Sequence, residues 1–68
     1  MIKFLGIVDN GIYKVAKFDP QGYDGRIWGF NRENLELRIN NLKAQSIDTS
    51  VEEMALMELI KHEEGSNV

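Results

Sequence analysis

The sequence contains no cysteine, one proline and one histidine, His62. Without cysteine the chain can form neither disulfides nor a thiolate metal site, and this composition is typical of a reducing compartment. A single histidine cannot supply a two-histidine metal site within one chain. No apolar run approaches the ~20 residues that span a membrane, and the first residues lack the apolar segment of a signal peptide. We therefore expect a cytoplasmic protein that does not enter a membrane.

Patterns that carry catalysis or hold ligands are missing as well. None of the six glycines opens a phosphate-binding loop, because no Gly-Lys-Ser or Gly-Lys-Thr occurs. Asp19 and Asp24 could suggest a cation-binding loop, but the twelfth position, where an EF-hand needs glutamate, holds Phe30. We interpret both aspartates as turn-forming residues, and Glu52 and Glu53 as part of a solvated helix face. The sequence thus predicts no enzyme, no cofactor and no metal.

The 68-residue chain is small and acidic, with a net charge of −3. Chains of this size form one domain and bury only roughly 60% of the surface that the unfolded chain exposes, so a partner would add stability. The charge is divided unevenly: residues 1–45 carry seven Lys and Arg against five Asp and Glu, and residues 46–68 carry one against six. The two parts therefore have net charges of +2 and −5.

Two apolar runs flank Asp9-Asn10-Gly11 and predict a β-hairpin. Asn-Gly is favoured in a two-residue turn, whose central residues both need positive φ. That turn pairs Val8 with Tyr13. The alternative is a three-residue loop, which shifts the register by one residue and places Lys3 opposite Lys17. We prefer the two-residue turn because it avoids this pair of like charges.

In the preferred register the hairpin has two unequal faces. The face predicted to form the core carries Ile2, Phe4, Val8, Tyr13 and Val15. The opposite face keeps several apolar residues, namely Leu5, Ile7, Ile12, Ala16 and Phe18. A surface fully exposed to water would not need these residues, so we expect a second copy of the chain to cover them.

Residues 26–30 alternate and predict a short third strand, with Trp28 and Phe30 on one face and Ile27 on the other. Trp28 is the only tryptophan. We interpret it as a core residue, because a domain this small can rarely leave its largest apolar side chain outside, and a binding role is the alternative.

Asn31 is predicted to cap a helix that runs to about Gln45. Its apolar residues fall on one face, at Leu35, Ile39 and Leu42. Residues 35–39 also alternate and could form a fourth strand, but good helix formers dominate the segment and favour the helix. Three strands, a glycine and this capped helix resemble the HicB-type antitoxin domain up to about residue 45. That family continues with a strand where this chain continues with a second helix, and we transfer no site residue from it.

The last helix is predicted to begin with a capping box formed by Ser50 and Glu53 and to end at Gly65, leaving 66–68 as a frayed tail. One arc of this helix can pack on the domain, and it holds Val51, Ala55, Leu56, Leu59 and Ile60. Met54 and Met57 lie on the opposite side. Either the first helix covers these methionines, or they form a surface that binds a partner protein.

These elements predict a single α+β domain over residues 1–65, in the order β-β-β-α-α. The sheet has three antiparallel strands, made by the N-terminal hairpin and the third strand, and both helices pack on one of its faces.

The function that we expect is that of a small acidic protein–protein interaction module, possessing no enzymatic activity and acting as a phage- or mobile-element-type modulator or inhibitor of a host protein. We also expect it to form a homodimer. The residues that we expect at the interface with a partner or a second copy are Met54, Met57, Lys61, Ile7 and Ile12.

The alternative function is binding of single-stranded nucleic acid through an aromatic and basic sheet face. The residues that would form this face are Trp28, Tyr23, Arg26 and Lys17. We favour it less, because the core requires most of the aromatic residues and because the acidic chain has no dense basic stripe.

Overall fold

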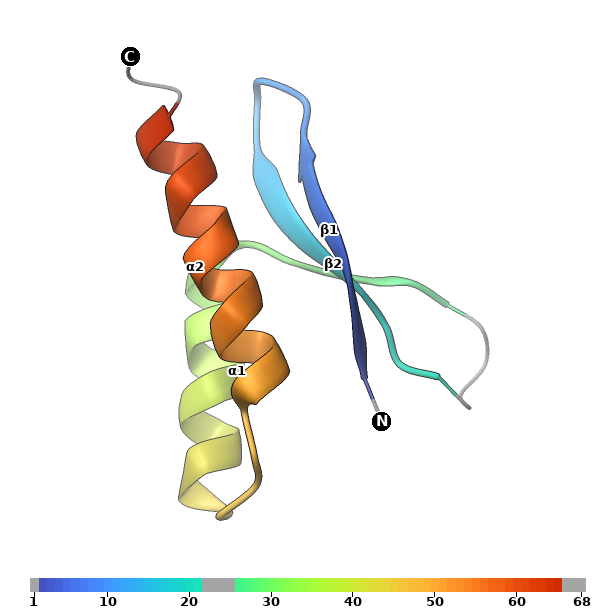
Figure 1. Cartoon of the computed structure of the whole chain (residues 1–68), viewed down its shortest axis with the longest axis vertical. Coiled ribbons are helices and arrows are strands. Elements are labelled where there is room, and N and C mark those ends of the chain that lie inside the picture. The colour runs from blue at the N-terminus through green and yellow to red at the C-terminus, as the bar shows by residue number, and fades with distance from the viewer. Residues whose placement is uncertain (1, 22–25, 66–68) are drawn as a thin grey trace.

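The computed structural model describes residues 2–21 and 26–65 of the chain. It contains strands β1 (Lys3–Asp9), β2 (Lys14–Asp19) and β3 (Trp28–Phe30), followed by helices α1 (Arg32–Ala44) and α2 (Ser50–Gly65). The strands form one antiparallel sheet in the order β1-β2-β3. Both helices lie on the same side of the hairpin (Figure 1). The predicted α+β fold in the order β-β-β-α-α is therefore confirmed, although β3 is shorter than expected.

The hairpin connection differs from both predicted loops. Asp9 pairs with Lys14, so four residues connect the strands. The side chain of Asn10 makes this loop possible, because its Oδ1 accepts hydrogen bonds from the backbone N–H groups of Ile12 and Tyr13, each at 3.0 Å. Gly11 adopts a φ of 85°, which a glycine tolerates without strain. The side chain of Asn10 thus accepts hydrogen bonds from the loop backbone, in place of the backbone–backbone bonds of a tighter turn.

A β-bulge in β1 determines which residues reach the core. Phe4 pairs with Phe18 and Gly6 pairs with Lys17, so Leu5 is the extra residue. Gly6 has a φ of 131°, a conformation that L-residues rarely adopt. The bulge brings Phe4 onto the same sheet face as Ile7, and the rings of Phe4 and Phe18 lie 5.5 Å apart.

The prediction that Val8, Tyr13 and Val15 form the core face is therefore wrong. Ala16 and Phe18, predicted on the opposite face, are fully buried. The core consists of residues from β2, α1 and α2, namely Ala16, Phe18, Leu35, Ile39, Ala55 and Leu59. Ile2, Phe4, Ile7, Trp28 and Phe30 pack around it.

The two helices cover different parts of the sheet. Helix α2 contacts β1 and β2, whereas α1 contacts β2, β3 and α2. Residues 35–39 lie within α1, so the alternative of a fourth strand is wrong. As predicted, Asn31 caps α1, and its side chain accepts a hydrogen bond from Asn34 N at 2.8 Å. Among the described residues, no helix is both long and apolar enough to cross a membrane.

The start of α2 is built differently from the predicted capping box. Thr49, rather than Ser50, provides the carbonyl oxygen that accepts the N–H of Glu53, at 2.8 Å. The Thr49 hydroxyl also donates to Glu53 Oε2 at 2.5 Å. Ser50 instead donates its hydroxyl and its N–H to Asp48 Oδ1. Ser50 therefore bonds to Asp48 before the helix, and the expected reciprocal bonds between Ser50 and Glu53 do not form.

Candidate protein-interaction surface

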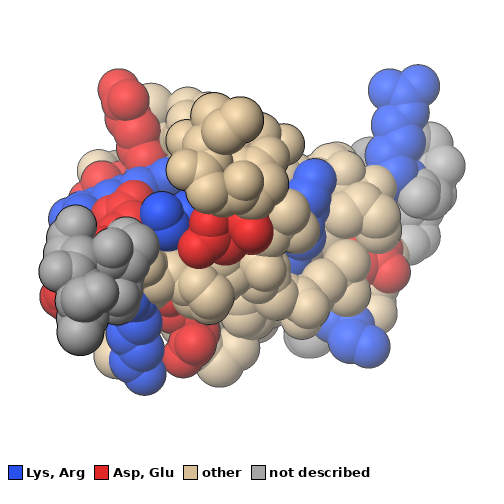
Figure 2. Space-filling model, turned by 90° about the horizontal axis from the view of Figure 1, so that it is seen from above, with Lys and Arg blue, Asp and Glu red and all other residues tan. Residues whose placement is uncertain are grey.

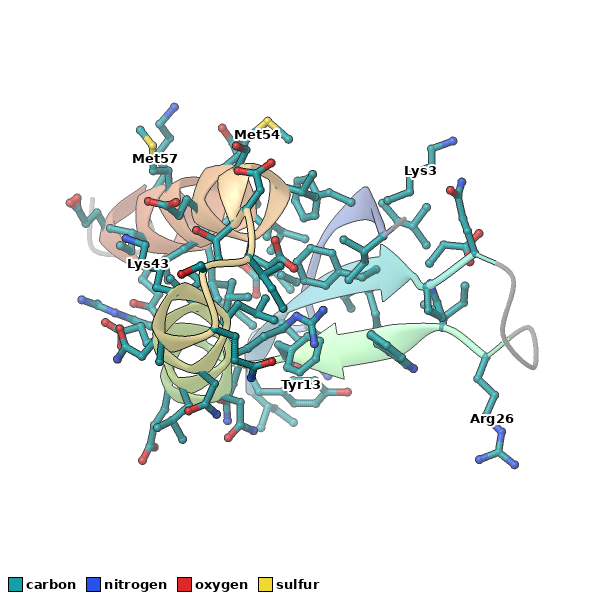
Figure 3. The ribbon with its side chains drawn as sticks, turned by 90° about the horizontal axis from the view of Figure 1, so that it is seen from below. Lys3, Tyr13, Arg26, Lys43, Met54 and Met57 are labelled. Atoms are coloured by element: carbon teal, nitrogen blue, oxygen red, sulfur yellow. The ribbon has the colours of Figure 1, made fainter. Side chains whose placement is uncertain are left out.

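Met54, Met57 and Lys61 lie together on the open side of α2, and we call this surface the Met face. The side chains of Met54 and Met57 are 52% and 61% exposed. Figure 3 shows both of them pointing away from α1 and from the sheet. The interpretation in which α1 covers the methionines is therefore wrong. The spacing of three and four residues places all three side chains along one stripe of the helix.

Ion pairs border the Met face. Lys61 Nζ lies 3.4 Å from Glu58 Oε1 on the same helix, and Lys43 Nζ of α1 lies 3.4 Å from Glu53 Oε1. The hydrogen bond from Thr49 and the charge of Lys43 lower the pKa of Glu53 below its ordinary value. These charged groups are exposed, so they add little energy, but they define a polar rim around an apolar centre.

The fold places the two hairpin residues of the expected interface, Ile7 and Ile12, in different surroundings. Ile12 is 90% exposed in the hairpin connection. Ile7 is half-buried and packs against the core, so it is not part of an open face. The tip of the hairpin approaches the end of α2, where His62 Nδ1 lies 3.8 Å from Asp9 Oδ2. A shallow hollow there is lined by residues of the hairpin and of both helices: Ile12, Tyr13, Lys14, Asn31, Arg32, Glu33 and Glu63.

The four residues of the expected nucleic-acid face do not share one face. Lys17 pairs with Gly29 and Phe18 pairs with Trp28, so Lys17 and Trp28 point to opposite sides of the sheet. Arg26 extends away from the sheet in Figure 3, and Tyr23 lies outside the described residues. In the view of Figure 2, Lys and Arg are scattered among Asp and Glu and form no continuous basic band. Lys17 and Trp28 therefore cannot belong to one continuous nucleic-acid face.

Sequence reasoning missed the ion pair at the centre of the helix layer. Arg38 Nε of α1 lies 3.2 Å from Glu52 Oε2 of α2, and the Glu52 side chain is only 4% exposed. The interpretation of Glu52 as a solvated residue is therefore wrong. A helical wheel could have revealed this, because at 100° per residue Glu52 falls between Ala55 and Leu56, inside the apolar arc.

No group of three or more His, Asp or Glu side chains in the described part of the chain could hold a metal ion. Comparison with known proteins finds no family model, no curated protein and no solved structure that matches the chain.

Proposed function

We propose that this protein is a non-enzymatic interaction module that docks on another protein through the Met face of α2. The observation that carries the proposal is the exposure of Met54 and Met57, each more than half open to solvent. A chain of 68 residues has few apolar side chains for its core. Two methionines at adjacent positions of one stripe therefore point to a surface that a partner covers.

The chemistry of the Met face suits a protein partner. Methionine is flexible and polarisable, so it adapts to an apolar groove of irregular shape. Fully burying one such side chain contributes about 1.5–3 kcal/mol. Lys61 can lay its aliphatic stem along the same groove while its ammonium group stays in water.

The small size and the cysteine-free composition support the further proposal of a cytoplasmic modulator of the phage or mobile-element type. No individual residue supports this part of the proposal, which rests only on the size and composition of the chain. It predicts that the binding partner is a protein of the host cell.

A second copy of the chain is a further partner that we propose for the Met face. In an antiparallel pair of α2 helices, Lys61 of one copy would lie beside the first turn of the other, which carries the exposed Glu53. The Met side chains would meet near the two-fold axis. Apolar burial would supply most of the affinity, and the charges would select the antiparallel orientation.

The proposal is tested with Met57→Asp and with the matched control Leu37→Asp. Leu37 is 55% exposed on α1, outside the Met face. Immobilised wild-type protein should retain a host protein in stoichiometric amounts, and Met57→Asp should lose it while Leu37→Asp keeps it. Equal retention by both variants would place the contact elsewhere. Sedimentation equilibrium of the same three proteins tests the homodimer, which Met57→Asp alone should dissociate.

A further inference from the structure

Arg38 is held in a fixed orientation by contacts on two sides. Its Nε donates to Glu52 Oε2 at 3.2 Å. Its Cζ atom lies 5.4 Å from the centre of the Trp28 ring and 5.7 Å from the centre of the Phe30 ring. Guanidinium groups stack favourably on aromatic faces, and the nearly buried carboxylate fixes the Nε edge. The bond to Glu52 and the two ring contacts together restrict where the guanidinium group lies.

The two Nη groups of Arg38 remain available. Among the described residues, the only hydrogen bond that Arg38 makes uses Nε. In the same part of the chain no polar side-chain atom is buried without a partner, so both Nη groups reach solvent. The Arg38 side chain is 27% exposed, which agrees with a guanidinium that is open along one edge.

Arg38 lines a shallow hollow of about 550 Å³. Its lining consists of Ile27, Trp28, Gly29, Phe30 and Arg38. These residues provide apolar and aromatic surface and one cation, and none of them is acidic. Arg38 also lines a smaller hollow of about 310 Å³, whose lining includes Asp48 and Glu52. Those carboxylates disfavour an anion there, so charge complementarity selects the aromatic hollow.

We propose that Arg38 and this aromatic hollow bind a carboxylate attached to an apolar group, as found at the C-terminus of a peptide that ends in leucine or phenylalanine. The Nη edge offers parallel N–H donors whose spacing matches the two oxygens of a carboxylate. The apolar side chain of the ligand then rests against Trp28 and Ile27. Because this site lies on β3 and α1, it is separate from the Met face and does not depend on the function proposed above.

The experiment uses the fluorescence of Trp28, which is the only tryptophan and lines the site. The probe is a short N-acetylated peptide that ends in leucine with a free carboxylate, and its matched control carries a C-terminal amide. The free carboxylate should give a saturable change of Trp28 emission, with an affinity at least about tenfold above that of the amide. Equal affinities, or no saturable binding up to millimolar peptide, would overturn the proposal.

Two variants separate binding from folding. Arg38→Lys keeps the charge opposite Glu52 but removes the forked donors, so affinity should fall by about tenfold while circular dichroism stays unchanged. Ile27→Glu places a negative charge in the hollow, at a side chain that is 49% exposed. It should weaken binding by a similar factor, whereas Ile12→Glu, which adds the same charge at an exposed residue outside this hollow, should not. If a single-stranded oligonucleotide binds and the peptide does not, the site is a nucleotide-stacking site and our assignment is wrong.

Discussion

The backbone N–H of Ile47 donates to the carbonyl oxygen of Leu42 at 2.9 Å, across the end of α1. Ser46 N donates to Lys43 O in the same turn, and Ser46 itself has a φ of 60°. These two bonds form a Schellman motif, in which the residue with positive φ is most often glycine. Leu42 and Ile47 also line the same small hollow, in agreement with the hydrophobic contact that accompanies this motif.

We predict that Ser46→Gly stabilises the protein. A non-glycine residue in the left-handed region costs roughly 1–2 kcal/mol, and the extra backbone entropy of glycine in the unfolded chain offsets part of this, leaving a gain of about 0.5–1 kcal/mol. Urea denaturation measures the change in the free energy of unfolding. Ser46→Ala is the control, because alanine retains the same Cβ strain and should give no gain. Equal stabilisation by both variants would show that the backbone conformation is not the cause.

The ion pair between Arg38 and Glu52 gives a second prediction. Arg38→Met leaves the nearly buried Glu52 carboxylate without its partner. We expect the free energy of unfolding to fall by about 2–3 kcal/mol. This is at or below the lower end of the range for buried pairs, because Arg38 is partly exposed. The double variant Arg38→Met with Glu52→Leu removes both charges and should recover most of this loss. Chemical denaturation at pH 7 compares them. A double variant less stable than Arg38→Met would show that the unpaired carboxylate of Glu52 is not the cause of the loss.

The bulge in β1 gives a third prediction, by comparison of two glycines. Gly6→Ala should destabilise the protein by about 1–3 kcal/mol, because its φ of 131° is strained for alanine even though no atom lies within 4 Å of the added Cβ. At Gly29 the nearest atom to such a Cβ is Lys17 Nζ, at 3.2 Å. That atom ends a flexible side chain and can move, so Gly29→Ala should change stability by less. Thermal unfolding measures the loss of stability in both variants. A larger loss for Gly29→Ala than for Gly6→Ala would show that the backbone conformation at Gly6 is not the source of strain.

The order of elements and both helices could be predicted because their signals are local. Asn31 before a run of helix formers, with Leu35 and Ile39 four residues apart, predicts the same helix wherever it packs. Helix signals of this kind do not depend on distant partners. The helical period places Met54 and Met57 opposite the buried arc, but whether α1 covers them depends on tertiary packing and does not follow from the sequence.

The hairpin register could not be predicted because small local choices decide it. Asn-Gly is compatible with several loop lengths, and here the side-chain bonds of Asn10 favour the longer loop. The bulge at Leu5 then moves Phe4 onto the face of Ile7, so the core face cannot be found by strict alternation. The Arg38 site is equally hidden from the sequence, because it joins Arg38 of α1 with the aromatic residues of β3 and with Glu52 of α2.

The cap of α2 gives the last prediction, which concerns pH. The hydrogen bond from Thr49 and the nearby Lys43 lower the pKa of Glu53 below the ordinary glutamate value of 4.5. A carboxyl whose pKa is lower in the folded than in the unfolded protein adds stability above its unfolded pKa, and this contribution is lost as the pH falls through the folded pKa. Stability should therefore decline as the pH falls below 4.5, and part of that decline should come from Glu53.

A double-mutant cycle of Thr49→Val and Glu53→Gln isolates this contribution. Because Glu53→Gln removes the titrating group, the coupling between the two positions should be favourable at pH 7 and should shrink once Glu53 is protonated in the wild-type protein. Chemical denaturation at several pH values between 7 and 3 measures it. Lys43→Met, which removes the second cause, should shift the loss of coupling to higher pH. A coupling that is the same at pH 7 and pH 3 would show that the Glu53 charge does not contribute to the cap.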